Sequence, residues 1–470
     1  MRALIFAHRW LGVAFCLLFA MWFASGIVMH FVPFPGLSEV ERYAGFVPIG
    51  PEAVRHGPAA AVRAAKIEDA ERVRLYRRPD GAVYLVQGAS GVRAVHAADL
   101  SPAKVTDTLA LAIAAEHARR RGLDPEGARM TQLARYDQWT VPNGYDAHRP
   151  LHRIALNDDA GTELYVSSRT GEVVHDTTRR ERGWNYVGSI VHWCYPTALR
   201  RDWAAWDITV WTLSLAALVT ALAGAIVGTL RVRIVDGRPA SPYCGWHAWH
   251  HWLGIGCMFF VLTWIASGWL SMDHGRLFST GKLSAAETSV LQGTALDWKA
   301  AGEDVRPVPA DAREIEWFVF DGRMYRRERT GLSSQRLFVA GEAAGGARVF
   351  LDANEVGVAA RRLSPQCAPA AAVGADDAYH IASSMPQAPV YRVICGEAWY
   401  HIDGANGAVL EKLDPSRRAY RWFYTALHTL DFPALVARPV LRTSLVVVLC
   451  ALGFAFSVTA VVIGFKRVMR

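Results

Sequence analysis

Four long apolar runs interrupt this chain of 470 residues, and they limit the folds available to it more than any other feature. Charged residues make up 20% of the whole sequence but are rare inside the runs. Each run has about 20 residues or more, which is the length that crosses ~30 Å of hydrocarbon as a helix. We therefore predict transmembrane helices at 1–31, 204–230, 246–272 and 440–465. The first run is too long and uniform for a removable signal peptide, so we expect it to be retained.

Lys and Arg residues gather beside one end of each predicted helix. Short loops rich in these residues stay in the cytoplasm, so we expect both termini, the loop 231–245 and the tail 466–470 to be inside. The long segments 32–203 and 273–439 are then periplasmic. The basic residues concerned are Arg2, Arg9, Arg231, Arg233, Arg238, Lys466, Arg467 and Arg470. The formal net charge of +8 is partly a consequence of this topology. Because no nucleic-acid motif accompanies it, we expect no nucleic-acid partner.

A histidine pattern occurs twice within the apolar runs. His8 opens the motif H-R-W-L-G, and His250 opens H-H-W-L-G. An A-S-G triplet follows in each run and ends at Gly26 and Gly268, 18 residues after the respective histidine. The shared spacing indicates a duplicated membrane unit.

A second pair of histidines repeats with the same regularity. His192 lies 36 residues before Gly228, and His428 lies 36 residues before Gly464. Histidines at both ends of a duplicated membrane unit suggest paired axial ligands for haem.

Both long segments are typical of α+β structure. An alanine-rich stretch at 109–121 predicts a helix that Gly122 ends. Strands are predicted at 151–156, 163–167, 391–395 and 398–403, and two hairpins at 75–87 and 314–326. Cys367 and Cys395 share the second segment and could pair, and the sequence leaves this open.

Nearly the whole chain resembles the PepSY-associated transmembrane family, which includes bacterial ferric-siderophore reductases that carry haem b. The long segments resemble PepSY domains. The resemblance implies four transmembrane α-helices in a tandem-duplicated bundle, with two periplasmic α+β PepSY-like segments, in the bacterial inner membrane. It also implies two haems and His192 and His428 as outer ligands. The motifs are H-R-W-L-G at 8–12, V-H-W-C-Y-P at 191–196, W-H-H-W-L-G at 249–254 and L-H-T-L-D-F-P at 427–433.

His8 and His250 are the candidate ligands of an inner haem. Gly12 and Gly254 each lie four residues later on the same helical face, where the missing side chain leaves room for a flat macrocycle. The alternative is that both are interfacial histidines without a cofactor. His251 could replace His250 as the ligand or hold a metal ion together with His247.

His192 and His428 are the candidate ligands of an outer haem. Pro196 and Pro433 follow them closely and should break any helix that continues into the spanning segment. We therefore expect both histidines outside the bilayer core, on a short helix or bend.

His30 and His274 are rivals at the outer ends of the first and third predicted helices. They could be solvated or capping residues, or they could line an acceptor site. Trp22 or Trp264 could lie between the two haems.

These patterns, together with the family resemblance, predict a haem-b protein that moves electrons across the membrane to a periplasmic acceptor. The resemblance suggests a ferric siderophore as this acceptor. No G-x-G-x-x-G motif follows a predicted strand, so the electrons should come from a partner flavoprotein or a membrane quinol. One alternative is a PepSY protein that is anchored in the membrane and binds or regulates without redox chemistry. A transporter is a third reading.

Overall fold

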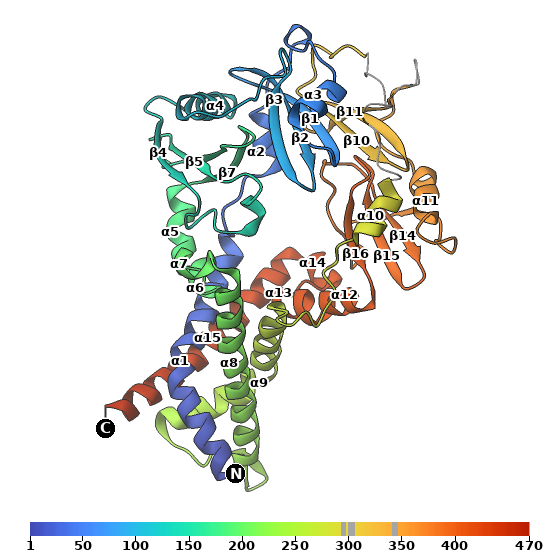
Figure 1. The fold of residues 1–470 in the computed structure, drawn as a ribbon. Helices are drawn as coiled ribbons and strands as arrows, with labels where there is room; N and C mark the ends of the chain where they lie inside the picture. The colour runs from blue at the N-terminus through green and yellow to red at the C-terminus, as the bar shows by residue number, and fades with distance from the viewer. Residues whose placement is uncertain (293–297, 299–305, 341–345, 470) are drawn as a thin grey trace. The chain divides into compact units, whose positions relative to one another are not determined.

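Four long helices and a set of antiparallel sheets make up the computed structural model, which describes residues 1–292, 298, 306–340 and 346–469 (Figure 1). The chain separates into two compact units. The helical unit comprises Met1–Phe34, Arg180–Thr280 and Ser416–Arg470, and the sheet unit comprises Pro35–Arg179 and Gly281–Pro415. The predicted outer segments were 32–203 and 273–439. The end regions of both segments belong to the helical unit, where their short helices pack against the long helices.

The long helices of the helical unit coincide with the four apolar runs, and each is long and apolar enough to cross a membrane. Each long helix packs on the long helices next to it in the sequence, and the first also packs on the last: α1 contacts α8 and α15, and α9 contacts α8 and α15. They are α1 (Arg2–Phe31), α8 (Trp203–Arg231), α9 (Gly245–Ser271) and α15 (Pro439–Val468). This closed ring of contacts places the two predicted repeats around one shared apolar core, which includes Phe23, Ala217, Val261 and Cys450.

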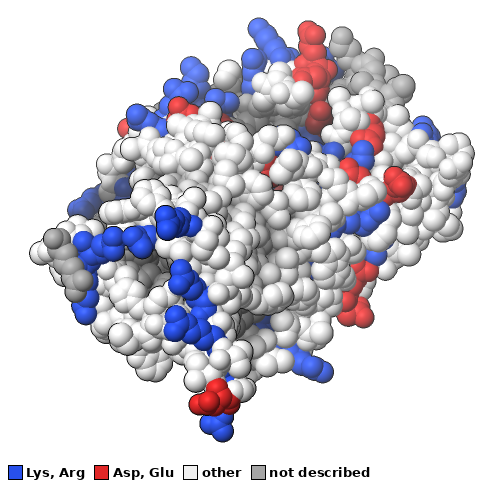
Figure 2. Space-filling model, turned by 90° about the horizontal axis from the view of Figure 1, so that it is seen from below, with Lys and Arg blue, Asp and Glu red and all other residues white. Residues whose placement is uncertain are grey.

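Positive charge marks the end of the bundle where both chain termini lie, and we call it the basic end (Figures 1 and 2). The short hairpin of β8 (Arg233–Val235) and β9 (Arg238–Ala240) joins α8 to α9 there. Asp236 is the sole acidic residue in this hairpin.

Short helices precede α8 and α15 at the opposite end of the bundle. Pro196 immediately precedes one of them, and Pro433 begins another, so the predicted proline breaks are confirmed. The elements before α8 are α5 (Arg179–Val187), α6 (Ser189–His192) and α7 (Thr197–Arg200). Those before α15 are α12 (Pro415–Tyr420), the π-helix η3 (Arg421–Ala426), α13 (Leu427–Thr429) and α14 (Pro433–Val436).

One six-stranded antiparallel sheet in the sheet unit draws strands from both halves of the chain. Its order is β12-β11-β10-β1-β2-β3. The predicted hairpins at 75–87 and 314–326 are confirmed as β1–β2 and β10–β11. The strands are β1 (Ala70–Arg78), β2 (Gly81–Gly88), β3 (Gly91–His96), β10 (Glu314–Phe320), β11 (Arg323–Gly331) and β12 (Ser334–Val339).

The centre of this sheet is the antiparallel pair β1 and β10, where Arg74 lies opposite Glu316 and Leu75 lies opposite Ile315. If the sequences of the two hairpins are aligned at their turns, Arg74 of the first corresponds to Ile315 of the second, and Leu75 corresponds to Glu316. The local two-fold axis thus passes between these two residue pairs. The sequence predicted the hairpins but not that they join across this axis.

Two four-stranded antiparallel sheets complete the sheet unit, in the orders β4-β5-β6-β7 and β13-β14-β15-β16. Cys367 and Cys395 form a disulfide, which settles the pairing that the sequence left open. The strands are β4 (Arg129–Ala134), β5 (Leu151–Ala155), β6 (Glu163–Ser167), β7 (Val173–Thr177), β13 (Ala371–Ala372), β14 (Val390–Cys395), β15 (Ala398–Asp403) and β16 (Val409–Leu413). The remaining helices of the sheet unit are α2 (Glu39–Ala44), η1 (Pro51–Ala53), α3 (Pro58–Ala65), α4 (Asp107–Arg120), η2 (Asn143–Tyr145), α10 (Ala285–Gln292) and α11 (Ala353–Arg361).

A buried ionic network ties the first four-stranded sheet to the six-stranded one. Arg74 of β1 contacts Glu314 and Glu172 at 2.6 Å each, and Arg42 and Arg329 also contact Glu314. Removing one partner of a buried pair leaves an uncompensated charge and costs about 3–5 kcal/mol. The network therefore fixes how the turn that carries Glu172 meets the central sheet.

The buried His401 makes the stability of the sheet unit depend on pH. Burial, with a further contribution from Arg392, lowers the pKa of His401 from 6.5 to about 4. Arg392 donates to its Nε2 at 2.8 Å, which requires a neutral ring. Because the unfolded chain binds this proton more tightly, stability is full above pH 6.5 and falls as the pH drops toward 4.

We expect this one histidine to cost about 2 kcal/mol of stability between pH 7.5 and pH 5. Thermal unfolding of the purified protein at the two pH values should show a smaller difference for His401→Gln than for the unchanged protein. His56→Gln, at an exposed position, should leave the difference unchanged. An equal pH response in all three proteins would contradict the prediction.

Candidate functional site

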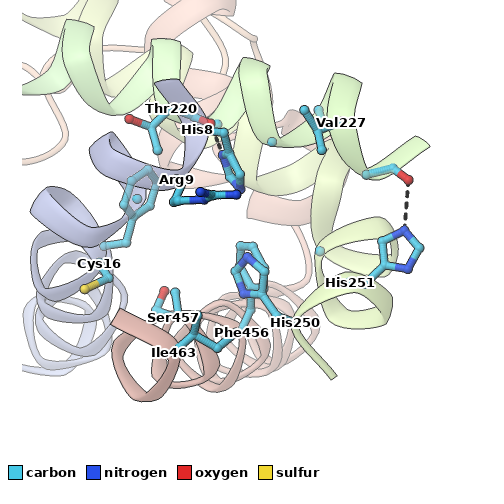
Figure 3. Close-up of a pocket in the computed structure, with 18 of the residues that line it drawn as sticks. His8, Arg9, Cys16, Thr220, Val227, His250, His251, Phe456, Ser457 and Ile463 are labelled. Atoms are coloured by element: carbon cyan, nitrogen blue, oxygen red, sulfur yellow. Dashed lines mark hydrogen bonds between the residues drawn. The ribbon is translucent and has the colours of Figure 1, made fainter. Parts of the chain in front are cut away.

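His8 of α1 and His250 of α9 face each other across a cavity of about 350 Å³ at the basic end of the bundle (Figure 3). Their ring centroids are 6.3 Å apart and the ring planes differ by 31°. All four long helices contribute to the walls, which are largely apolar and include Val13, Ala221, Ile255, Met258, Leu262 and Ile463. The structure thus brings together two histidines that lie 242 positions apart in the sequence.

Both rings of this inner pair are held through Nδ1. The Nδ1 of His8 lies 3.1 Å from the carbonyl oxygen of Thr220, and that of His250 lies 2.9 Å from Thr459 Oγ1. A carbonyl can only accept, so Nδ1 of His8 carries the proton. Thr459 already donates its hydroxyl proton to the Phe456 carbonyl, so it too accepts. Each Nε2 is therefore left with a lone pair, as a metal ligand requires.

His192 and His428 form a second pair near the other end of the bundle, again with ring centroids 6.3 Å apart and planes at 66°. Ser25 Oγ lies 2.9 Å from Nδ1 of His192, and Ser267 Oγ lies 3.1 Å from Nδ1 of His428. Both serines donate their own proton to a carbonyl of their helix, so they accept from the histidines. This outer pair consequently has the same tautomer as the inner pair.

The four Nε2 atoms make no hydrogen bond within the part of the chain that the structure describes, whereas every Nδ1 is engaged. Two pairs of histidines, each with free lone pairs and the same centroid separation, are the most distinctive feature of the helical unit.

The outer histidines lie beside the ends of α1 and α9 that are opposite the basic end. We expected them outside the bilayer core, and His192 contacts Ser25, six residues before α1 ends, and His428 contacts Ser267, four residues before α9 ends. At 1.5 Å per residue, these positions are about 6–9 Å inside the helix ends. The short helices that carry the histidines lie along α1 and α9. Because α1 has 30 residues, about 45 Å, and the hydrocarbon core is ~30 Å thick, a position outside the bilayer core stays a prediction.

The A-S-G triplets have a role that spacing alone did not reveal. Their serines orient the outer histidines, and their glycines make room for the rings. A Cβ on Gly26 would lie 3.8 Å from His192 Cε1, and one on Gly268 would lie 3.1 Å from His428 Cε1. The triplets were recognised as repeated, but the fold decides which histidines they serve.

The glycines proposed to accommodate a macrocycle are not equivalent. Both Gly12 and Gly254 line the inner cavity. A Cβ on Gly12 would meet nothing within 4 Å, whereas one on Gly254 would approach the Phe456 ring at 3.2 Å. The closest approach is at Gly224 of α8, which the sequence did not single out. A Cβ added there would lie 2.5 Å from His8 Cε1.

The rival histidines have other partners. Both ring nitrogens of His251 are hydrogen-bonded, Nδ1 to Ser241 and Nε2 to the Gly228 carbonyl, each at 2.9 Å. His247 lines the cavity. His30 bonds Thr443 Oγ1 at 3.0 Å, and His274 bonds Asp207 at 2.6 Å. Figure 3 shows His251 turned away from the space between His8 and His250.

Aromatic side chains fill the bundle between the two histidine pairs. Phe19 lines the inner cavity and lies 6.3 Å from Trp22, whose Nε1 donates to the His192 carbonyl at 2.9 Å. On the α9 side, Phe23 lies 6.1 Å from Trp264, whose carbonyl accepts from His428 Nδ1. Both tryptophans that the sequence suggested as intervening residues thus contact the outer pair.

The second half differs from the first around its outer histidine. The π-helix η3 precedes His428, and π-helical turns are found mostly at functional sites. Its Tyr424 packs on His428 with centroids 5.6 Å apart, and Tyr420 packs on Tyr424 at 5.2 Å. At the corresponding distance before His192 stands Gly188, which packs on Val28 instead.

No protein-family model matches the chain, and no curated protein matches it. The structure therefore carries the functional argument together with the motifs.

We expect Gly224→Ala to destabilise the helical unit by about 1–3 kcal/mol, because the added methyl group overlaps the His8 ring and must displace it. Gly256→Ala, where nothing lies within 4 Å, is the matched control and should be neutral or stabilising by up to about 1 kcal/mol. Thermal unfolding in detergent measures both. Equal behaviour of the two variants would argue against the close packing of His8 on α8.

Proposed function

We propose that this protein is a membrane haem-b protein that transfers electrons across the bilayer, with His8 and His250 as ligands of an inner haem and His192 and His428 as ligands of an outer haem. The observation that carries the proposal is the geometry that the two pairs share. Both have ring centroids 6.3 Å apart, and in both each Nδ1 is hydrogen-bonded and each Nε2 is not.

The centroid separation fits two imidazoles on opposite sides of one metal. A ligating imidazole nitrogen lies about 2 Å from the metal and about 1.2 Å from its ring centroid, so the two centroids should be about 6.3 Å apart. Two rings packed directly on each other would be closer.

A pair of ligands suits haem better than it suits a free ion. Within the described residues no group of three or more His, Cys, Asp or Glu side chains could hold a metal ion. Haem needs two axial ligands from the protein, since its macrocycle supplies the rest. The apolar walls and the open space beside Gly12 suit the inner cavity to a flat, largely apolar group.

A bound haem would supply one-electron redox chemistry. The chain would hold it through imidazole nitrogens of fixed tautomer and would surround it with largely apolar side chains. Along α1 the positions of His8 and Ser25 are 17 residues apart, about 26 Å of helix. Phe19 and Trp22 lie within this stretch, with their ring centroids 6.3 Å apart.

The proposed orientation in the membrane rests on the charges and the cysteines. The basic end, with both termini, would face the cytoplasm. The Cys367–Cys395 disulfide would place the sheet unit in an oxidising compartment, here the periplasm of a bacterial inner membrane. The donor would be a flavoprotein or a membrane quinol. The acceptor class rests on the family resemblance, which suggests a ferric siderophore reduced near the outer pair.

A visible spectrum of the purified protein, oxidised and reduced, tests the proposal. We expect the bands of bis-histidine haem b, and His8→Ala or His428→Ala should each remove about half of the haem. His251→Ala is the matched control and should keep all of it, because both of its ring nitrogens are already bonded within the protein. A protein without a reducible haem spectrum after expression with sufficient haem would instead support a non-redox binding protein or a transporter.

The serines predict a selective effect on the outer site. Ser25→Ala removes the serine acceptor of His192 Nδ1, and loss of such a partner costs about 10–100-fold in metal affinity. Ser267→Ala should weaken binding less, because His428 Nδ1 keeps the Trp264 carbonyl as an acceptor. Haem titration should show weakened binding at one of two sites. Ser271→Ala, on the same helix as Ser267 but bonded to the Gly268 carbonyl, should leave both sites unchanged. If all three variants bound haem alike, the serines would not orient the ligands.

A further inference from the structure

Two arginines line the inner cavity without an acidic partner. Arg9 follows the candidate ligand His8, and Arg467 comes from the end of α15. Figure 3 shows Arg9 beside His8 at the cavity. Neither guanidinium forms an ion pair among the described residues, and Arg467 lies 5.5 Å from the ring of Trp10 on α1. No Asp or Glu is among the described residues that line this cavity.

Two like charges at one cavity repel each other, although both arginines are exposed and water screens part of this repulsion. An anionic group in the cavity would remove this cost and accept hydrogen bonds from both guanidinium groups, which bind carboxylates bidentately. Two positive side chains match a ligand that carries two carboxylates at one edge and an apolar body.

The positive charge at the cavity comes unequally from corresponding positions of the two repeats. His251 stands in the second repeat where Arg9 stands in the first, and it is already bonded within the protein. Arg231 holds the position in the first half that corresponds to Arg467, and it is not among the described residues that line the cavity. The positive side of the cavity is thus formed by α1 and α15 alone.

We infer that Arg9 and Arg467 bind the two propionate groups of the inner haem, and that they fix one orientation of this cofactor, with its propionates toward the basic end and the side formed by α1 and α15. This inference rests on the proposed function. It adds a specific anion site to the cavity and explains why a duplicated bundle would bind an asymmetric cofactor in one orientation.

The inference is tested by titrating haem into the full-length protein from which the cofactor has been removed. A His428→Ala background limits binding to the inner site. The double variant Arg9→Gln/Arg467→Gln should bind haem about tenfold more weakly, because two partly exposed contacts between a guanidinium and a carboxylate are lost. Arg233→Gln, an exposed cation of the basic end that does not line the cavity, should bind as the background does.

The dimethyl ester of haem serves as the second probe, since it lacks both carboxylates. It should bind the double variant and the background equally. The reduction potential of bound haem should also fall in the double variant, because a nearby positive charge favours the reduced iron. Equal haem affinity in variant and background would overturn the inference, and so would an equally large loss with the ester. If the unchanged protein bound no haem, the proposed function itself would fail.

Discussion

The hydrogen bonds that fix the four histidine rings are the constraint on which the proposed chemistry depends. An imidazole in a membrane bundle has two tautomers and several rotamers, and only one combination presents Nε2 to a partner ring. In each of the four cases a group on a neighbouring helix selects it: the Thr220 carbonyl, Thr459, Ser25 or Ser267. The three hydroxyl groups are themselves committed as donors to their own helices, which removes the remaining ambiguity.

This arrangement ties ligand geometry to helix packing. His192 and His428 are carried by short helices rather than by the spanning helices, and their orientation comes from α1 and α9. Each pair joins the two repeats, so neither half could form a site alone. The same logic holds in the sheet unit, where β1 and β10 pair across a local two-fold axis. Duplication in this chain therefore produces interfaces between halves rather than two independent domains.

The two repeats differ in the residues that surround the candidate haem ligands. A π-helix with Tyr424 precedes His428, whereas a glycine stands at the matching place before His192. Arg9 of the first repeat corresponds to His251 of the second. Arg9 lines the cavity with an unpaired charge, whereas His251 hydrogen-bonds the loop between α8 and α9 and the end of α8. A strictly symmetric bundle would give both histidines of a pair the same surroundings, and these differences remove that equivalence.

The sequence by itself determined the four apolar helices, the α+β character of the two long segments, the two central hairpins and the histidines worth considering. These follow from local composition, periodicity and spacing, which the chain carries without reference to its fold. Only the tertiary structure decided that His8 meets His250 and His192 meets His428, that the A-S-G serines hold the outer rings, and that the hairpins merge into one sheet. Those facts depend on which helices and strands become neighbours. Residues such as Ser25 and His192 lie 167 positions apart, so no local pattern could have connected them.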